Sequence, residues 1–155
     1  THGGSMRYIT GRKNIHKISD NVNTLLEKEK LKNLDNISSC NKFKNNCELS
    51  KIKTRKSLLK FKDNNYKIAG YAATSKSTTI LNYCNINSKI IDYICDTTPE
   101  KIGKFSPGTH IPIVDMYHFK KFNPDVAYLF AWNHKDEILK KEKNYKGKWF
   151  SHVAL

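Results

Sequence analysis

The residues best suited to holding an anion lie between positions 73 and 79. A single lysine, Lys76, stands there among small and hydroxylated residues, in "ATSKSTT", directly after the apolar stretch "KIAGYA". Main-chain amides at the start of a helix carry partial positive charge and bind phosphate groups, and a lysine adds a full charge. Gly70 would allow close backbone approach, but residue 72 is alanine, so the glycine fingerprint of dinucleotide-binding loops is incomplete. The stretch therefore fits either an anion site or a plain strand-to-helix turn.

An acidic residue follows the next apolar run of the chain. Asp96 comes directly after residues 90–95 and precedes Thr97, Thr98 and Pro99. Dinucleotide-binding folds hold a ribose hydroxyl with an acidic residue at the end of the second strand. Aspartate before such a sequence is equally typical of a turn. Both interpretations of Asp96 stay open.

Two further loops carry aromatic and polar residues beside apolar runs. The stretch "KFSPGTH" forms a constrained loop before residues 111–114, and Phe105 could pack against a planar base there. Trp132, Asn133 and His134 follow the apolar run that begins at residue 126. Because ligands of open α/β sheets bind outside the carboxyl ends of the strands, we expect all four loops to converge on one rim.

The elements that must position these loops alternate along the chain after residue 65. Continuous apolar runs, each followed by a helical pattern, indicate a parallel sheet covered on both faces. We therefore predict an α/β fold, a Rossmann-like three-layer domain with a mostly parallel sheet. The expected strands are 66–72, 90–95, 111–114, 126–132 and 149–155, and the expected helices are 78–84, 117–122 and 136–145.

A helical arm precedes the predicted sheet. Residues 6–10 resemble a short strand, and a helix is expected from Asp20 as its N-cap. After a break at 33–36, apolar residues recur at mostly helical spacing up to residue 63. This pattern predicts a helical hairpin with lysines on its outer faces.

Composition limits the classes of partner. The 155 residues include 28 Lys and Arg against 14 Asp and Glu, which gives a formal net charge of +14. The basic residues are dispersed without an arginine-rich run, so a compositional habit explains this charge better than a nucleic-acid surface does. No apolar run is long enough to cross a bilayer. With four cysteines, no C-x-x-C pair and no signal peptide, we expect a reduced, cytoplasmic setting, and we expect no metal site.

Four stretches together resemble the C-terminal part of the sugar C-methyltransferases that act on nucleotide-linked deoxysugars. They read "THGGSMR", "KIAGYAATSKSTTILNYC", "IDYICDTTPEKIGKFSPGTHIPIV" and "AWNHKDEI". Members of that family have an N-terminal zinc-binding module, a central domain that binds S-adenosylmethionine and a C-terminal Rossmann-like domain that helps to hold the nucleotide sugar. The family usually reads Gly-Tyr-Gly-Ala where this chain has Ala72. If that position needs a positive φ, alanine strains the turn.

The resemblance implies a division of the chain and a set of site residues. Residues 1–12 would end the last strand of the methyltransferase domain, 13–65 would form a helical connector arm, and 66–155 would form the nucleotide-sugar-binding domain. His2 is the one candidate for a catalytic role, and the catalytic residues are otherwise unknown. The implied substrate-binding residues are Gly3, Gly4, Ser5, Ala73, Thr74, Ser75, Lys76, Asp96, Lys104, Phe105, Gly108, Thr109, His110, Asn133 and His134.

The activity implied by the resemblance belongs to the complete enzyme. A base would remove the proton beside a keto group of the sugar, and the enolate would take the methyl group of S-adenosylmethionine. By this likeness the chain lacks the methyl-donor domain, which would come from the same gene or from a separate chain. We therefore expect it to bind a nucleotide-diphosphate sugar weakly, to bind no cofactor and to be inactive alone.

Two alternatives come from other classes. The chain could be a non-catalytic module that docks onto a separately encoded methyltransferase chain, since a methyl-donor domain is missing from an otherwise complete Rossmann-like unit. It could also be a nucleic-acid-binding domain, which only the charge supports. That alternative predicts an affinity that falls steeply with added salt.

Overall fold

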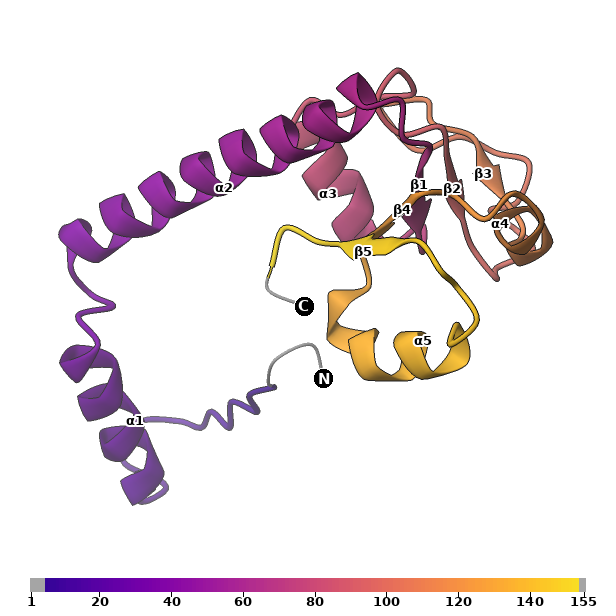
Figure 1. Cartoon of the computed structure of the whole chain (residues 1–155). Coiled ribbons are helices and arrows are strands. Elements are labelled where there is room, and N and C mark those ends of the chain that lie inside the picture. Colours follow the sequence, from indigo (N-terminus) through magenta and orange to yellow (C-terminus); the bar gives the residue numbers. More distant parts are fainter. Residues whose placement is uncertain (1–4, 154–155) are drawn as a thin grey trace. The chain divides into compact units, whose positions relative to one another are not determined.

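The structure, a computed structural model, describes residues 5–153 and divides at residue 49 into two compact units (Figure 1). The first unit contains α1 (Asp20–Leu31) and the first turns of α2 (Ile37–Asp63). The residue that caps α1 is Ser19, not Asp20 as predicted, because the Ser19 hydroxyl accepts a hydrogen bond from the Asn21 amide. The break between the helices falls where the sequence indicated it.

The apolar side chains of the first unit remain exposed. Helix α1 buries none of its residues, and Val22, Leu25 and Leu26 are among the exposed large apolar side chains. Residues 6–10 form no strand, so this prediction was wrong. A strand requires a neighbouring strand for its hydrogen bonds, and none of the residues that the structure describes pairs with this stretch.

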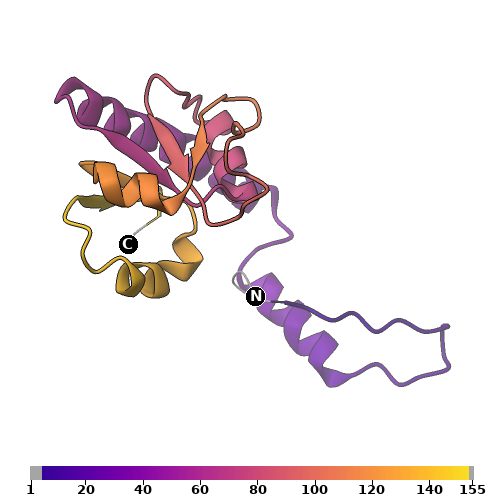
Figure 2. The ribbon, with the colours of Figure 1, turned by 90° about the vertical axis from the view of Figure 1, so that its right-hand side faces the viewer.

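The second unit contains a five-stranded sheet in which every pairing is parallel. The strand order is β3-β2-β1-β4-β5. This confirms the predicted α/β class. The strands are β1 (Ile68–Tyr71), β2 (Tyr93–Cys95), β3 (Ile113–Val114), β4 (Val126–Leu129) and β5 (Lys148–Phe150). The helices of this part are α3 (Ser75–Tyr83), α4 (Met116–Phe122), the 3-10 helix η1 (Trp132–His134) and α5 (Lys135–Lys141) (Figure 2).

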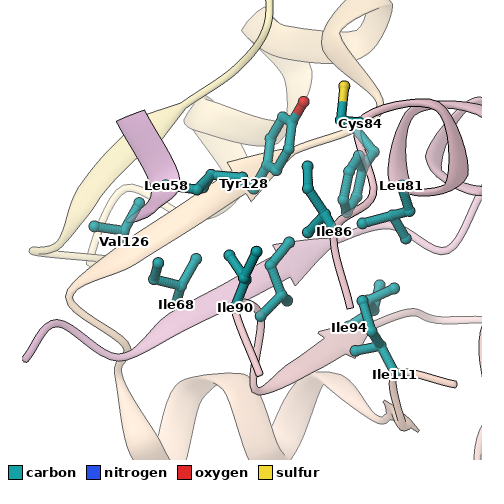
Figure 3. Packing of buried hydrophobic residues seen from close by; sticks show 12 residues of the cluster. Leu58, Ile68, Leu81, Cys84, Ile86, Ile90, Ile94, Ile111, Val126 and Tyr128 are labelled. Atoms are coloured by element: carbon teal, nitrogen blue, oxygen red, sulfur yellow. The ribbon is translucent and has the colours of Figure 1, made fainter. Parts of the chain in front are cut away.

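Successive residues of each strand contribute to opposite faces of the sheet. In β4, Val126 and Tyr128 pack with Leu58 of α2 and Leu81 of α3, on the face shown in Figure 3. The intervening Ala127 and Leu129 belong to a second cluster that includes Phe119 of α4 and, at its border, Ile138 of α5. The sheet is therefore the middle of three layers. Burial on both faces explains why its strands read as continuous apolar runs.

The last turns of α2 belong to this sheet-containing unit. Thr54 and Leu58 are buried. The Arg55 guanidinium donates hydrogen bonds to the main-chain oxygens of Cys84, at 3.4 Å, and Asn85. Those oxygens lie just after α3, where carbonyl groups of a helix lack partners in the helix itself. Arg55 thus fastens the end of α2 to the end of α3.

One half-buried histidine makes the fold sensitive to acid. His152 Nδ1 lies 3.2 Å from the hydroxyl oxygen of Tyr128, and burial lowers the pKa of His152 below its ordinary value of about 6.5. The folded state therefore favours the neutral imidazole. Its contribution to stability is complete above pH 6.5 and is lost as the pH falls from there through the lower folded-state pKa.

We predict that His152→Gln flattens the decrease in the free energy of unfolding between about pH 6.5 and 5. Urea unfolding of the 155-residue chain at several pH values measures this. His16→Gln is the matched control, because His16 is exposed and should leave the slope unchanged. An identical slope for His152→Gln and the unmodified chain would contradict the prediction.

Candidate functional site

The order of the strands defines where a ligand can enter the sheet. From β1 the chain passes through α3 to β2 on one side, whereas β4 lies on the other side of β1 and leads through α5 to β5. The direction of winding therefore reverses between β1 and β4. Open α/β sheets bind ligands outside the carboxyl ends of the strands at such a switch point.

A hydrogen bond joins α3, which follows β1, to η1, which follows β4, at this switch point. Lys76 Nζ donates to Asn133 Oδ1 over 2.6 Å, and the same ammonium lies 5.1 Å from the centre of the Trp132 ring. Lys76 is partly buried between these groups. The structure thus brings together the lysine in the first turn of α3 and the amide of η1, two residues that the sequence placed on one rim.

The hydroxylated residues around Lys76 build the start of α3. Thr74 is the N-cap: its Oγ1 accepts from the Ser77 amide over 3.1 Å, and the Ser77 hydroxyl donates to the Thr74 oxygen over 2.6 Å. These bonds extend the helix to Ser75, three residues before the predicted start. Ser75 itself is exposed. The capping contacts are those of any strand-to-helix turn, while the first amides of α3 face the switch point together with Lys76.

Asp96 holds the main chain of the loop after β1. One carboxylate oxygen, Oδ2, accepts from the Ala73 amide over 2.7 Å and lies 3.4 Å from Lys101 Nζ, and the other accepts from the Thr98 amide over 2.8 Å. Lys101 also donates to the Ala73 oxygen over 2.8 Å. Burial acts to raise the pKa of Asp96, but the bonds from Thr98 and Ala73 and the charge of Lys101 outweigh it. The pKa therefore lies below its usual value.

Asp96 thus makes hydrogen bonds that fix the conformation of the main chain around Ala73 and Thr98. Its side chain is buried with both oxygens bonded to the protein, and contact with a ribose stays a prediction. Lys101 is a neighbour of this carboxylate that the sequence did not indicate. It follows Asp96 by five residues and has no motif of its own, so only the fold of the 96–101 turn shows that it contacts Ala73.

At the end of β1, Gly70 differs from its expected role, whereas Ala72 has the positive φ considered for its position. A Cβ on Gly70 would lie 2.7 Å from Phe130 Cε2 and 2.9 Å from Ile94 Cγ1, so the space beside this glycine holds core side chains and not a ligand. Ala72 has a φ of 74°. The position therefore does need a positive φ, and alanine carries its strain.

The loop before β3 does not join this rim. Residues 103–105 run antiparallel to 112–113, and a turn closed by Ser106 and Ile111 follows. The tip of the turn lies beside the last residues of α3: Asn82 donates to the Pro107 oxygen over 3.0 Å, and a Cβ on Gly108 would lie 2.2 Å from Asn82 Oδ1. Lys76 is at the opposite end of this helix. The expected convergence of all four loops on one rim is therefore wrong for residues 106–110.

The remaining predicted site residues divide into three groups. In the turn before β3, the Thr109 hydroxyl lies 2.7 Å from that of Ser106, and His110 has a positive φ of 53°. Lys104, Phe105, His134 and Ser5 are exposed, and His134 Nδ1 lies 3.8 Å from Glu137 Oε2. His2, Gly3 and Gly4 lie outside the described residues. Within 5–153, no group of three or more His, Cys, Asp or Glu side chains is arranged to hold a metal ion.

The strain at Ala72 gives a prediction for stability. We expect Ala72→Gly to raise the free energy of unfolding by about 1 kcal/mol, because glycine adopts a positive φ without the penalty of a Cβ. Ala73→Gly is the matched control: Ala73 is not among the residues with positive φ, so glycine there should cost about 0.4–1 kcal/mol through the unfolded chain. Chemical unfolding of the two variants measures both. A loss of stability in Ala72→Gly would contradict the strain.

Comparison with known proteins identifies the family of the chain. The family described as the C-methyltransferase C-terminal domain matches residues 1–153. The C-methyltransferase NovU of Streptomyces niveus is 37% identical over 78 residues, which are 50% of this chain and 19% of that protein. The matched region thus spans about a fifth of its relative. Since the family match covers almost the whole sequence, the chain belongs to the C-methyltransferase C-terminal domain family.

Proposed function

We propose that this chain is the substrate-binding C-terminal part of an S-adenosylmethionine-dependent C-methyltransferase that acts on a nucleotide-linked keto-deoxysugar. Family membership supports the methyltransferase part of this proposal. The observation that carries the substrate part is the Lys76–Asn133 bond across the switch point, beside the first turn of α3.

The nucleotide's diphosphate is the group that this rim suits best. The partial positive charge of the α3 amides and the full charge of Lys76 act on the same small volume. An ammonium has three N–H donors, so its bond to Asn133 is compatible with a phosphate oxygen as another acceptor. The Trp132 ring, 5.1 Å from the ammonium, provides a flat surface beside it. Holding the diphosphate here would fix the sugar for a reaction performed elsewhere in the complete enzyme.

We propose that S-adenosylmethionine binds in another domain of the complete enzyme. The space beside Gly70, through which a cofactor would approach the main chain of β1, is filled by Phe130 and Ile94. We therefore assign no residue of this chain to the methyl donor and no proton transfer to its side chains. In the proposed reaction the donor supplies the methyl group from another domain.

The exposed apolar side chains of α1 support the inference that a partner domain covers this helix. Val22, Leu25, Leu26 and Leu31 lie on a helix that buries nothing in the described chain. We propose that the methyltransferase domain covers them, whether it belongs to the same polypeptide or to another.

No helix among residues 5–153 is both long and apolar enough to cross a membrane.

Binding of nucleoside diphosphates tests the substrate part. We expect calorimetric titration of the 155-residue chain at low salt to detect at least one of dTDP, UDP, GDP and CDP. Lys76→Met should weaken that binding about tenfold or more, because a charge-assisted bond to phosphate is lost. Lys120→Met removes the same charge from an exposed position of α4 and should leave binding within about twofold.

Lys76→Arg and thermal unfolding complete this test. Arginine keeps the charge and should retain more affinity than methionine, and melting curves will show that each variant is folded. No heat with any of the four nucleotides would contradict the proposal. If Lys76→Met and Lys120→Met weaken nucleotide binding equally, the loss of affinity comes from the overall charge of the protein and not from a site at Lys76.

A further inference from the structure

Lys101 holds the main chain of the loop that leads into the proposed diphosphate site. Its Nζ donates to the Ala73 oxygen over 2.8 Å and lies 3.4 Å from Asp96 Oδ2. The same Asp96 oxygen accepts from the Ala73 amide over 2.7 Å. One ion pair therefore binds both polar groups of the Ala73 main chain, which fixes the direction in which the chain enters α3.

The residues on either side of Ala73 are held as well. The Ala72 amide donates to the Cys95 oxygen over 2.9 Å, and the Thr74 amide donates to the Ala72 oxygen over 3.1 Å. Thr74 then caps α3 by accepting from the Ser77 amide. Each residue from 72 to 74 thus has a hydrogen bond within the protein, so the loop is already ordered before a ligand binds, which lowers the cost of binding.

The Asp96 carboxylate lies close to this site and has the wrong sign of charge for an anionic ligand. Two residues of extended chain span at most about 7 Å, so Asp96 Oδ2 lies within about 10 Å of the Ser75 amide at the start of α3. Salt screens exposed charges over about 10 Å at 0.1 M, and it screens buried charges less. The Asp96 side chain is only 7% exposed. Without a partner, this carboxylate would repel a diphosphate.

Lys101 supplies the opposite charge. Burial acts to raise the pKa of Asp96, but hydrogen bonds from Thr98 and Ala73 outweigh it together with the nearby ammonium, so the carboxylate is ionised at neutral pH. Opposite charges 3.4 Å apart largely cancel each other's effect on a ligand farther away. The ion pair can therefore fix the loop without adding net negative charge beside the α3 amides.

From these contacts we infer that Lys101 is a positioning residue for the diphosphate. It acts through two other residues, because it holds the Ala73 oxygen and cancels the charge of Asp96. The carboxylate alone could hold the Ala73 amide, but the lysine makes an acidic anchor compatible with an anionic ligand. This inference rests on the proposed function, since it assigns Lys101 a role in binding at the same rim as Lys76.

The test uses inorganic pyrophosphate, which carries the diphosphate without a base or a sugar. In an NMR titration of the 155-residue chain at low salt, we expect amide shifts at Ser75, Lys76 and Ser77. Lys101→Met should bind pyrophosphate about tenfold more weakly, because the carboxylate charge is then uncompensated. Lys101→Arg keeps the cation and should bind within about threefold of the unmodified chain. Lys120→Met, the matched control at an exposed position of α4, should bind within about twofold.

A double variant separates the charge of Lys101 from its hydrogen bond. Asp96→Asn removes the negative charge and keeps one oxygen that can accept from an amide. If Lys101 acts by charge, Lys101→Met combined with Asp96→Asn should bind pyrophosphate at least about threefold more tightly than Lys101→Met alone. If Lys101 only held the main chain, the double variant would bind no better, since it has lost a further hydrogen bond.

Melting curves will show that each variant is folded. If Lys101→Met does not fold, Lys101→Gln takes its place, because glutamine keeps a donor for the Ala73 oxygen and removes the charge. The inference is overturned by equal binding of Lys101→Met and the unmodified chain, by a double variant that binds no better than the single one, or by the absence of shifts at residues 75–77. Failure of the proposed function appears separately, as no heat with dTDP, UDP, GDP or CDP.

Discussion

The buried carboxylate of Asp96 is the constraint on which the carboxyl edge depends. By accepting from the Ala73 amide, it fixes the main chain between the end of β1 and the first residue of α3. Lys101 strengthens the same point, since it donates to the Ala73 oxygen and lies near the carboxylate. The position of Thr74 as N-cap follows from this, and so does the side of the helix from which Lys76 reaches Asn133. A residue that contacts no ligand can thus determine where a ligand's phosphate would lie, in the way that outer residues orient those that bind.

The exit of β1 shows how packing and ligand access compete for the same space. Gly70 lacks a side chain because Phe130 and Ile94 fill the volume beside it. The next turn therefore has to carry the chain away from the core at once, and it does so through the left-handed conformation of Ala72. Any ligand is kept outside this turn, where the α3 amides and Lys76 lie. The strain of Ala72 is stored at the one position where the chain changes from strand to helix direction, as is common near functional sites.

The sequence was informative where burial alone decides the structure. Strands buried on both faces are apolar, so most strands were recognisable from their composition, and β5 was recognisable from Trp149 and Phe150 although its first residue, Lys148, is exposed. The predicted ranges of several strands were too long. The pairing of Lys76 with Asn133 was foreseeable because both follow strands that end at one edge. The turn at 106–110 was not, because it results from residues 103–105 folding back along β3, a pairing that has no local signal. Likewise, a helical pattern indicated α1 correctly but could not show that its apolar side chains stay exposed in the described chain.

The two edges of the sheet differ in what a ligand would have to displace. At the carboxyl edge, hydrogen-bond partners within the protein already engage Asp96, Thr74 and Lys76. The free energy of binding a phosphate is therefore only the difference between its new hydrogen bonds and those that it shares or replaces. This argues for modest affinity when the chain acts alone and for a larger contribution from a domain that closes over the rim. At the amino edge the Tyr93 hydroxyl has no hydrogen-bond partner among the described residues, but it is buried, so a ligand would have to displace the side chains around it to form a bond. The strength of binding at the carboxyl edge therefore depends on how completely the fold satisfies its own polar groups there.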